Sequence, residues 1–110
     1  NSKPIMVESK PLLDILEQED IKRIDGMKID IEGFEDKALF PFFDSAPSEL
    51  WPRVVVLEDC NKRLWENDIL NKMKDIGYVL YGRTRGNQIL KLANNALYSD
   101  GNSTSLHYRR

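Results

Sequence analysis

Two short stretches of the sequence place carboxylates directly after apolar runs. The stretch "MKIDIEG" carries Asp30 and Glu32 up to a glycine, and the stretch "RVVVLED" ends in Glu58 and Asp59. Both runs have the length and the β-branched content of buried strands. Ligands of open α/β sheets bind beyond the carboxyl ends of the strands. If the two strands lie close together in the sheet, these four carboxylates share one edge of it and form a candidate site.

A cluster of carboxylates limits what can bind there. Like charges that lie close together raise one another's pKa, so such a cluster fits a cation or a hydrogen-bond donor. Three occupants are consistent with it: a divalent metal ion held by oxygen ligands, a cationic cosubstrate such as a sulfonium, or a substrate hydroxyl that needs a general base. The structural alternative is that Asp30 or Glu32 caps the helix expected after Gly33. The residue pattern alone leaves both interpretations open.

The other chemically capable side chains give weaker signals. Trp65 begins an expected helix and could stack on a ligand at this edge, although core packing is the commoner role of such a residue. Cys60 follows the second acidic pair without a histidine partner in the body of the domain, and His107 lies in a polar C-terminal stretch. The stretch "GRTRGN" lacks the Lys-Ser/Thr pair of a phosphate-binding loop.

Composition places the chain among globular domains. The 110 residues are 41% hydrophobic and 31% charged, which fits one domain or part of one. No apolar run approaches the ~20 residues of a membrane span, and no signal-peptide pattern is present, so no membrane partner is expected. The single cysteine is consistent with a cytoplasmic protein. Residues 1–60 carry 7 Lys and Arg against 14 Asp and Glu, which argues against nucleic acid as a partner of the acidic edge.

The hydrophobic pattern predicts strands that alternate with helices and a closing hairpin around Arg85-Gly86. Alternation of this kind indicates parallel strands joined by helical crossovers, in a three-layer α/β sheet that is mostly parallel. Pro41 is expected to end or kink its helix. A polar and poorly ordered tail is expected over residues 99–110. The expected strands lie at 5–7, 27–31, 53–59, 78–84 and 87–93, and the expected helices at 11–21, 34–43 and 64–77.

Three stretches together resemble the FkbM family of S-adenosylmethionine-dependent methyltransferases. They are "SKPLLDILEQEDIKRIDGMKIDIEGFEDKALFPFF", "WPRVVVLED" and "GYVLYGRTRGNQIL", which span roughly residues 9–92. The most specific part is "MKIDIEGFE", which is similar to the Lys-Ile-Asp-Val-Glu-Gly-aromatic-Glu signature of that family. It is preceded, as in the family, by a Leu-Asp-x-Leu helix and an Ile-Asp turn.

The resemblance implies a partial Rossmann-like sheet of the class I methyltransferase type. Residues 1–98 would be the C-terminal part of the domain, with the fourth and fifth strands at 26–32 and 53–59. The seventh strand would lie between the fifth and the sixth. The glycine-rich loop that binds S-adenosylmethionine is expected upstream of Asn1, because the sequence contains no Gly-x-Gly. No cofactor-binding residue is therefore expected in this chain, which alone should be inactive.

The resemblance also implies roles for the acidic residues. Asp30 and Glu32 would line the methyl-transfer site, and one of them would act as general base toward a hydroxyl of a small-molecule or carbohydrate acceptor. Glu58, Asp59 and Trp65 would contact this acceptor, with no metal ligand assigned. Two other functions stay open. One is a non-enzymatic module that self-associates through the exposed edge of strand 27–31, and the other is a metal-dependent phosphoryl-transfer enzyme. The expected macromolecular partner is the missing N-terminal half or a second copy along the sheet edge.

Overall fold

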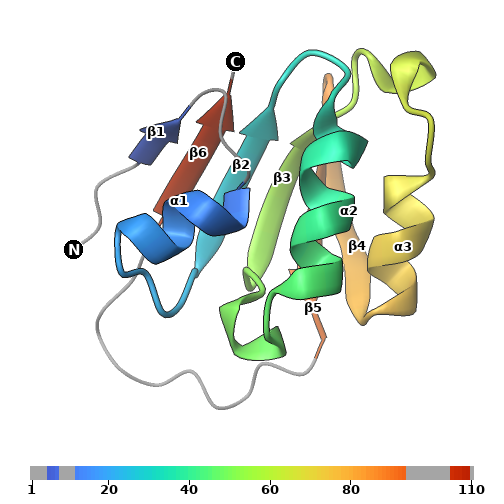
Figure 1. Cartoon of the computed structure of the whole chain (residues 1–110). Helices are drawn as coiled ribbons and strands as arrows, with labels where there is room; N and C mark the ends of the chain where they lie inside the picture. The colour runs from blue at the N-terminus through green and yellow to red at the C-terminus, as the bar shows by residue number, and fades with distance from the viewer. Residues whose placement is uncertain (1–4, 8–11, 94–104, 110) are drawn as a thin grey trace.

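A single mixed sheet organises the chain (Figure 1). The computed structural model describes residues 5–7, 12–93 and 105–109. Its strands are β1 (Ile5–Val7), β2 (Gly26–Asp30), β3 (Val54–Glu58), β4 (Tyr78–Thr84), β5 (Asn87–Leu92) and β6 (Ser105–Arg109). Its α-helices are α1 (Leu12–Gln18), α2 (Glu35–Ser45) and α3 (Ile69–Asp75), and the short 3₁₀ helices are η1 (Ser48–Leu50) and η2 (Lys62–Leu64).

The strands lie in the order β1-β6-β2-β3-β5-β4. The pairs β1–β6, β6–β2 and β2–β3 are parallel, whereas β5 runs antiparallel to both of its neighbours, β3 and β4. The hairpin turn falls at Arg85-Gly86, where Gly86 has a φ of 80° that suits glycine. The prediction of an α/β sheet with a parallel centre and a closing antiparallel hairpin is confirmed. So is the insertion of the last hairpin strand, β5, between β3 and β4.

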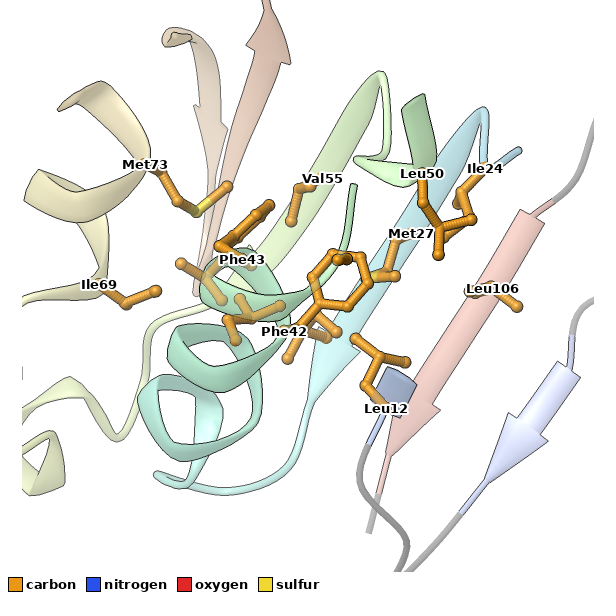
Figure 2. Close-up of a cluster of buried hydrophobic side chains, with 14 of the residues drawn as sticks. Leu12, Ile24, Met27, Phe42, Phe43, Leu50, Val55, Ile69, Met73 and Leu106 are labelled. Atoms are coloured by element: carbon orange, nitrogen blue, oxygen red, sulfur yellow. The ribbon is translucent and has the colours of Figure 1, made fainter. Parts of the chain in front are cut away.

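The core lies between one face of the sheet and the three helices (Figures 1 and 2). Alternate residues of the central strands point into it, among them Met27 in β2 and Val55 in β3. From α2, Phe42 and Phe43 fill the space above these strands and are at most 4% exposed. The helices α1, α2 and α3 all pack on this same face. A third layer was predicted, but within the described residues the fold has two.

The opposite face of the sheet carries a mixture of apolar and charged residues. Lys28, Val56 and Ile89 follow one another across β2, β3 and β5 in register, and all three are half-buried. No helix of the described residues lies on this face. The apolar run Val54–Leu57 was interpreted as a strand covered on both faces, and only its Val55 and Leu57 side is covered by the described helices.

The last strand contradicts one prediction. Residues 105–109 were expected in a poorly ordered tail, but they form β6 between β1 and β2. Their pairing with β2 satisfies backbone hydrogen bonds along its length and buries Leu106 opposite Met27. The prediction that β2 is an edge strand is therefore wrong as well. Residues 99–104 and 110 of the expected tail lie outside the described residues.

All three helices differ from their predicted bounds, and α1 ends at Gln18 instead of residue 21. The helix predicted at 64–77 begins only at Ile69, because the side chain of Asp68 accepts a hydrogen bond from the backbone N–H of Asn71 and caps it there. Pro41 does not end α2, which continues to Ser45. No helix in the described part of the chain has the length and apolarity needed to cross a membrane.

Candidate functional site

The two acidic strand ends lie side by side, as predicted. Strands β2 and β3 are parallel neighbours, and Ile29 is paired with Leu57, so Asp30 and Glu58 occupy adjacent positions at the carboxyl ends of the strands. Both side chains alternate with buried neighbours and so belong to the face opposite the helices, where both are half-buried. The structure thus brings together one carboxylate from each predicted pair.

The environment of Glu58 disfavours its charged form. Burial raises the pKa of Glu58 above its usual value of 4.5, a hydrogen bond from Cys60 opposes this, and the carboxylates of Glu35 and Asp30 raise it further. The hydrogen bond to Glu58 in turn raises the pKa of the Cys60 thiol. Cys60 is exposed and is therefore an accessible but weakly acidic thiol beside the carboxylates.

The raised pKa of Glu58 predicts a pH-dependent effect of Glu58→Gln. A carboxyl group whose pKa is raised by folding stabilises the fold below its unfolded pKa, and this contribution is lost as the pH rises through the folded value. Relative to the parent, Glu58→Gln should therefore become more stable as the pH rises from about 4 to about 7. Urea unfolding of both proteins at the two pH values measures this difference. A difference in stability that is the same at both pH values would contradict the expectation.

Glu32 occupies a different position from Asp30. It lies in the turn after β2, where it is exposed and has a φ of 58°, and Gly33 follows with a φ of 98°. The alternative that Asp30 or Glu32 caps α2 is wrong, because the N-cap residue is Phe34 and no side chain caps the helix. The turn after β2 is instead held by a residue within the helix.

That residue is Glu35, which is fully buried. Its Oε2 accepts a hydrogen bond from the backbone N–H of Ile31 at 2.9 Å, and its Oε1 accepts one from Gly33 at 3.0 Å. The indole Nε1–H of Trp65 donates a third hydrogen bond to Oε1 at 2.9 Å. No site role was assigned to Glu35 from the sequence. Its place as the last residue of the "MKIDIEGFE" signature was the signal that it does more.

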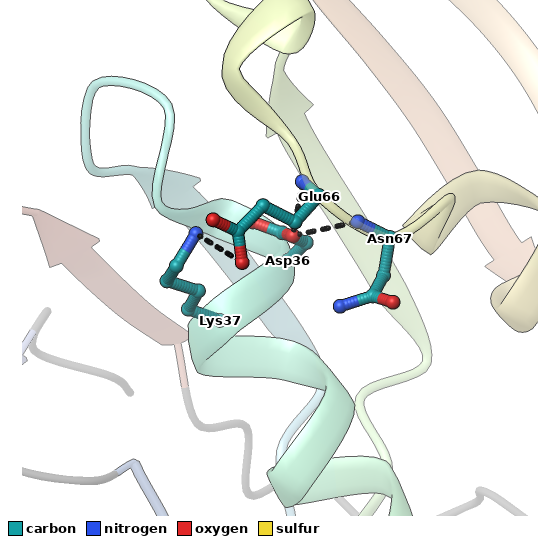
Figure 3. Close-up of polar contacts among 4 residues, drawn as sticks. All are labelled: Asp36, Lys37, Glu66 and Asn67. Atoms are coloured by element: carbon teal, nitrogen blue, oxygen red, sulfur yellow. Dashed lines mark hydrogen bonds and ion pairs between the residues drawn. The ribbon is translucent and has the colours of Figure 1, made fainter.

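The next residue, Asp36, is also fully buried and was also missed (Figure 3). Its Oδ2 accepts hydrogen bonds from the backbone N–H groups of Glu66 at 2.9 Å and Asn67 at 3.0 Å. The exposed ion pair between Lys37 and Glu66, at 3.5 Å, lies beside these contacts. Glu35 and Asp36 therefore connect the start of α2 to the loop that follows β3.

Asp59 and Trp65, which were predicted to contact the methyl acceptor, lie in or next to this loop. Asp59 accepts a hydrogen bond from the Nε2 of buried Gln88 at 2.8 Å, so one of its oxygens is already engaged with β5. Trp65 precedes α3 instead of beginning it, is half-buried, and packs against the edge of the core. Through Glu35, which hydrogen-bonds Trp65 and borders Glu58, the indole is joined to the carboxylates at the strand ends.

The turn after β2 also makes close contact with this loop through Gly33. A Cβ atom at Gly33 would lie 2.6 Å from Cδ1 and 3.1 Å from Cβ of Leu64, at a φ that L-residues rarely adopt. Gly33→Ala should lower the free energy of unfolding by about 1–3 kcal/mol. Gly82→Ala is the matched control, since nothing lies within 4 Å of its Cβ position. Thermal or urea unfolding measures both, and Gly33→Ala combined with Leu64→Ala separates the steric part from the backbone strain. Equal stabilities of the two alanine variants would contradict this assignment.

Other candidate chemistry is sparse in the described residues. No group of three or more His, Cys, Asp or Glu side chains there is arranged to hold a metal ion. His107 lies in the middle of β6, paired with Lys28, and not at the carboxyl ends of the strands.

Comparison with known families identifies the chain. The family model described as the methyltransferase FkbM domain matches residues 1–80, which include β2, the turn after it, β3 and the loop that carries Trp65. No curated protein and no solved structure is similar enough to the chain to match it. A match over this share of 110 residues is decisive, and the chain belongs to the FkbM methyltransferase domain family.

Proposed function

We propose that this chain provides the acceptor side of an S-adenosylmethionine-dependent methyltransferase that methylates a hydroxyl oxygen of a small-molecule or carbohydrate acceptor. The observation that carries the proposal is the pairing of Asp30 with Glu58 at the carboxyl ends of two parallel strands. Family membership adds the reaction class. The strand order β2-β3-β5-β4 also agrees with the fourth, fifth, seventh and sixth strands of a class I methyltransferase sheet.

The side chains at this edge have complementary roles in the proposal. Asp30 is the general base, because it is half-buried at the carboxyl end of β2, whereas Glu32 is exposed in the turn. Glu58 hydrogen-bonds the acceptor, and Trp65 forms one side of its site. As the oxygen–methyl bond forms and the sulfur–methyl bond breaks, the hydroxyl proton passes to Asp30. S-adenosylmethionine supplies the electrophilic methyl group when it is bound, and the protein contributes chiefly alignment of the acceptor.

The described residues fit only one end of S-adenosylmethionine. Two carboxylates beside the reacting centre suit a sulfonium cation. Nothing in the sequence suits the nucleoside and the methionine carboxylate, because it has no Gly-x-Gly loop. We therefore propose that a segment outside this chain binds that end and packs on the sheet face that carries Val56 and Ile89. Half-buried apolar residues on a face without a described helix support this placement.

Two measurements test the proposal. Calorimetry of the chain should give a dissociation constant for S-adenosylmethionine weaker than about 10 μM, equivalent to less than roughly 7 kcal/mol of binding free energy. A longer polypeptide that contains this chain should transfer the labelled methyl group of S-adenosylmethionine to a monosaccharide glycoside or another small hydroxyl compound. If the chain alone binds S-adenosylmethionine tightly, the proposal that a segment outside the chain binds part of this cosubstrate is wrong. A longer polypeptide that binds S-adenosylmethionine but methylates only nitrogen or carbon would overturn O-methylation.

The edge strand β4 favours a second candidate function, a self-associating module. Its Val79 and Tyr81 are 56% and 70% exposed, and β4 pairs with the described sheet on one side only. An exposed apolar edge of this kind invites pairing with another strand. Under this alternative, sedimentation would show a concentration-dependent dimer that Val79→Lys dissolves. A monomer over the whole concentration range, in the parent and the variant alike, would exclude it.

A further inference from the structure

The loop 59–68, which joins β3 to α3, depends on two adjacent residues of α2 for its position. Asp36 accepts hydrogen bonds from the backbone N–H groups of Glu66 and Asn67 (Figure 3). Glu35 accepts one from the indole N–H of Trp65. Both carboxylates are fully buried. A buried carboxylate is costly unless hydrogen bonds compensate for lost hydration, and together these two accept five N–H groups.

Few side chains of the loop are buried, although Trp65 packs against the core and Leu64 lies beside Gly33. Leu64 at its centre is 52% exposed, and Cys60, Lys62 and Arg63 are also exposed. At its start, Asp59 is held by the backbone C=O of Gly86, which accepts from its N–H at 2.9 Å. A segment with few buried contacts opens easily unless specific hydrogen bonds hold it. The contacts with Glu35 and Asp36 are therefore the hydrogen bonds that tie residues 65–67 to α2.

The second carboxylate oxygen of Asp36 indicates a role beyond stability. Its Oδ1 is buried and has no hydrogen-bond partner among the described residues, while its Oδ2 accepts both N–H groups. Most buried carboxylate oxygens in proteins have a hydrogen-bond partner, so an unpaired one adds a cost to stability. The arrangement gives up some stability and gains a fixed loop position, which is the usual pattern at a site where a side chain must be placed accurately.

We propose that Glu35 and Asp36 form a latch that holds loop 59–68 on the turn after β2 and so positions Trp65 as one side of the acceptor site. Both are positioning residues that act through Trp65 and the loop. The part of this inference that concerns the acceptor rests on the proposed function, whereas the latch itself does not. Because Glu35 also borders Glu58, the latch sets the spacing between the indole and the carboxylates at the strand ends.

Amide hydrogen exchange and tryptophan fluorescence test the latch without methyl donor or acceptor. In a Trp51→Phe background, which leaves Trp65 as the single tryptophan, Asp36→Ala should speed amide exchange of Glu66 and Asn67 by about tenfold or more. Acrylamide should then quench Trp65 more strongly. Asp36→Asn should restore both readouts, because an amide oxygen can accept the same two N–H groups. Unchanged exchange in Asp36→Ala, or no rescue by Asp36→Asn, would overturn the latch.

Two further variants keep the test decisive. Lys37→Met removes the exposed ion pair with Glu66 and the cation–π contact with Phe34, but it leaves both carboxylates of the latch in place. It should leave exchange of Glu66 and Asn67 within about twofold of the parent. If Asp36→Ala does not fold, Trp65→Phe makes a milder break, since it deletes the indole donor and keeps an aromatic ring. It should speed exchange of the same two amides severalfold, and equal exchange would count against the latch.

The effect of the latch on binding of the methyl acceptor is measured separately. In a longer polypeptide that methylates a monosaccharide glycoside, Asp36→Ala should raise the KM for the glycoside by about tenfold and change kcat by less than about threefold. A purely structural role would reduce the active fraction and so lower the apparent kcat with KM unchanged, which would overturn the positioning role. If no methyl transfer is found at all, the proposed function fails, while the exchange and quenching results still decide the latch.

Discussion

Replacing Glu35 with alanine is expected to lower the free energy of unfolding by about 3–5 kcal/mol, the largest effect of any single polar substitution in the described residues. Three N–H groups, from Ile31, Gly33 and Trp65, lose their acceptor at once. The two backbone groups belong to Ile31 and Gly33, which are both buried, so water cannot replace the carboxylate without opening the turn. Urea unfolding followed by far-ultraviolet circular dichroism measures the loss.

Glu35→Gln provides the comparison for this prediction. An amide oxygen can still accept from Gly33 and Trp65, but the amide nitrogen would then face the N–H of Ile31, so an intermediate loss is expected. Glu49→Gln, at an exposed position in η1, should change stability by less than about 0.5 kcal/mol. If Glu35→Ala proves as mild as Glu49→Gln, the turn after β2 does not depend on this carboxylate.

The second large effect is expected on activity. In a polypeptide that carries out O-methylation, Asp30→Asn should lower kcat by about 10²–10⁴-fold, the usual contribution of a general base. The asparagine is nearly isosteric but cannot accept the proton of the acceptor hydroxyl. Protein stability should change little, because Asp30 is half-buried and lies at the end of β2. Steady-state kinetics with saturating S-adenosylmethionine measures the loss, and the unfolding curve of the same variant excludes a folding defect.

Glu32→Gln tests whether Asp30 or Glu32 is the general base. It should retain kcat within about threefold, because Glu32 is exposed and faces away from the core in the turn. The reverse pattern, in which Glu32→Gln is inactive and Asp30→Asn is active, would assign the base to Glu32. Losses of similar size in both variants would show that the two act together, and no loss in either would remove general-base catalysis from this edge.

Much of the fold follows from local patterns in the sequence. Alternation of apolar residues in β2 and the apolar run in β3 located both central strands, and the Arg85-Gly86 turn located the hairpin. The helix predicted at 64–77 was too long, because Trp65 and Ile69 lie four residues apart and so mimic one helical face. The side chain of Asp68 caps the helix at Ile69, and apolar periodicity carries no information about such a cap.

The candidate site was predictable only in outline. Position at a strand end is a local property, so the sequence could place Asp30 and Glu58 at one edge. The role of Glu35 depends on positive φ values at Glu32 and Gly33, which turn the chain so that Glu35 folds back to the end of β2. The link from Asp36 to Glu66 and Asn67 joins residues about thirty positions apart. Contacts of this range leave no trace in a local pattern.

Strand β6 makes the attachment of β1 to the sheet depend on the C-terminal end of the described chain. Strand β1 pairs with the sheet only through β6, and β6 lies beyond the residues matched by the family model. Loss of β6 would therefore detach β1 and leave β2 without its neighbour on that side. The two terminal strands thus form one cooperative unit, and a protease that cuts after Ala93 should release β1 from the sheet as readily as β6, even though nearly a hundred residues separate them in the sequence.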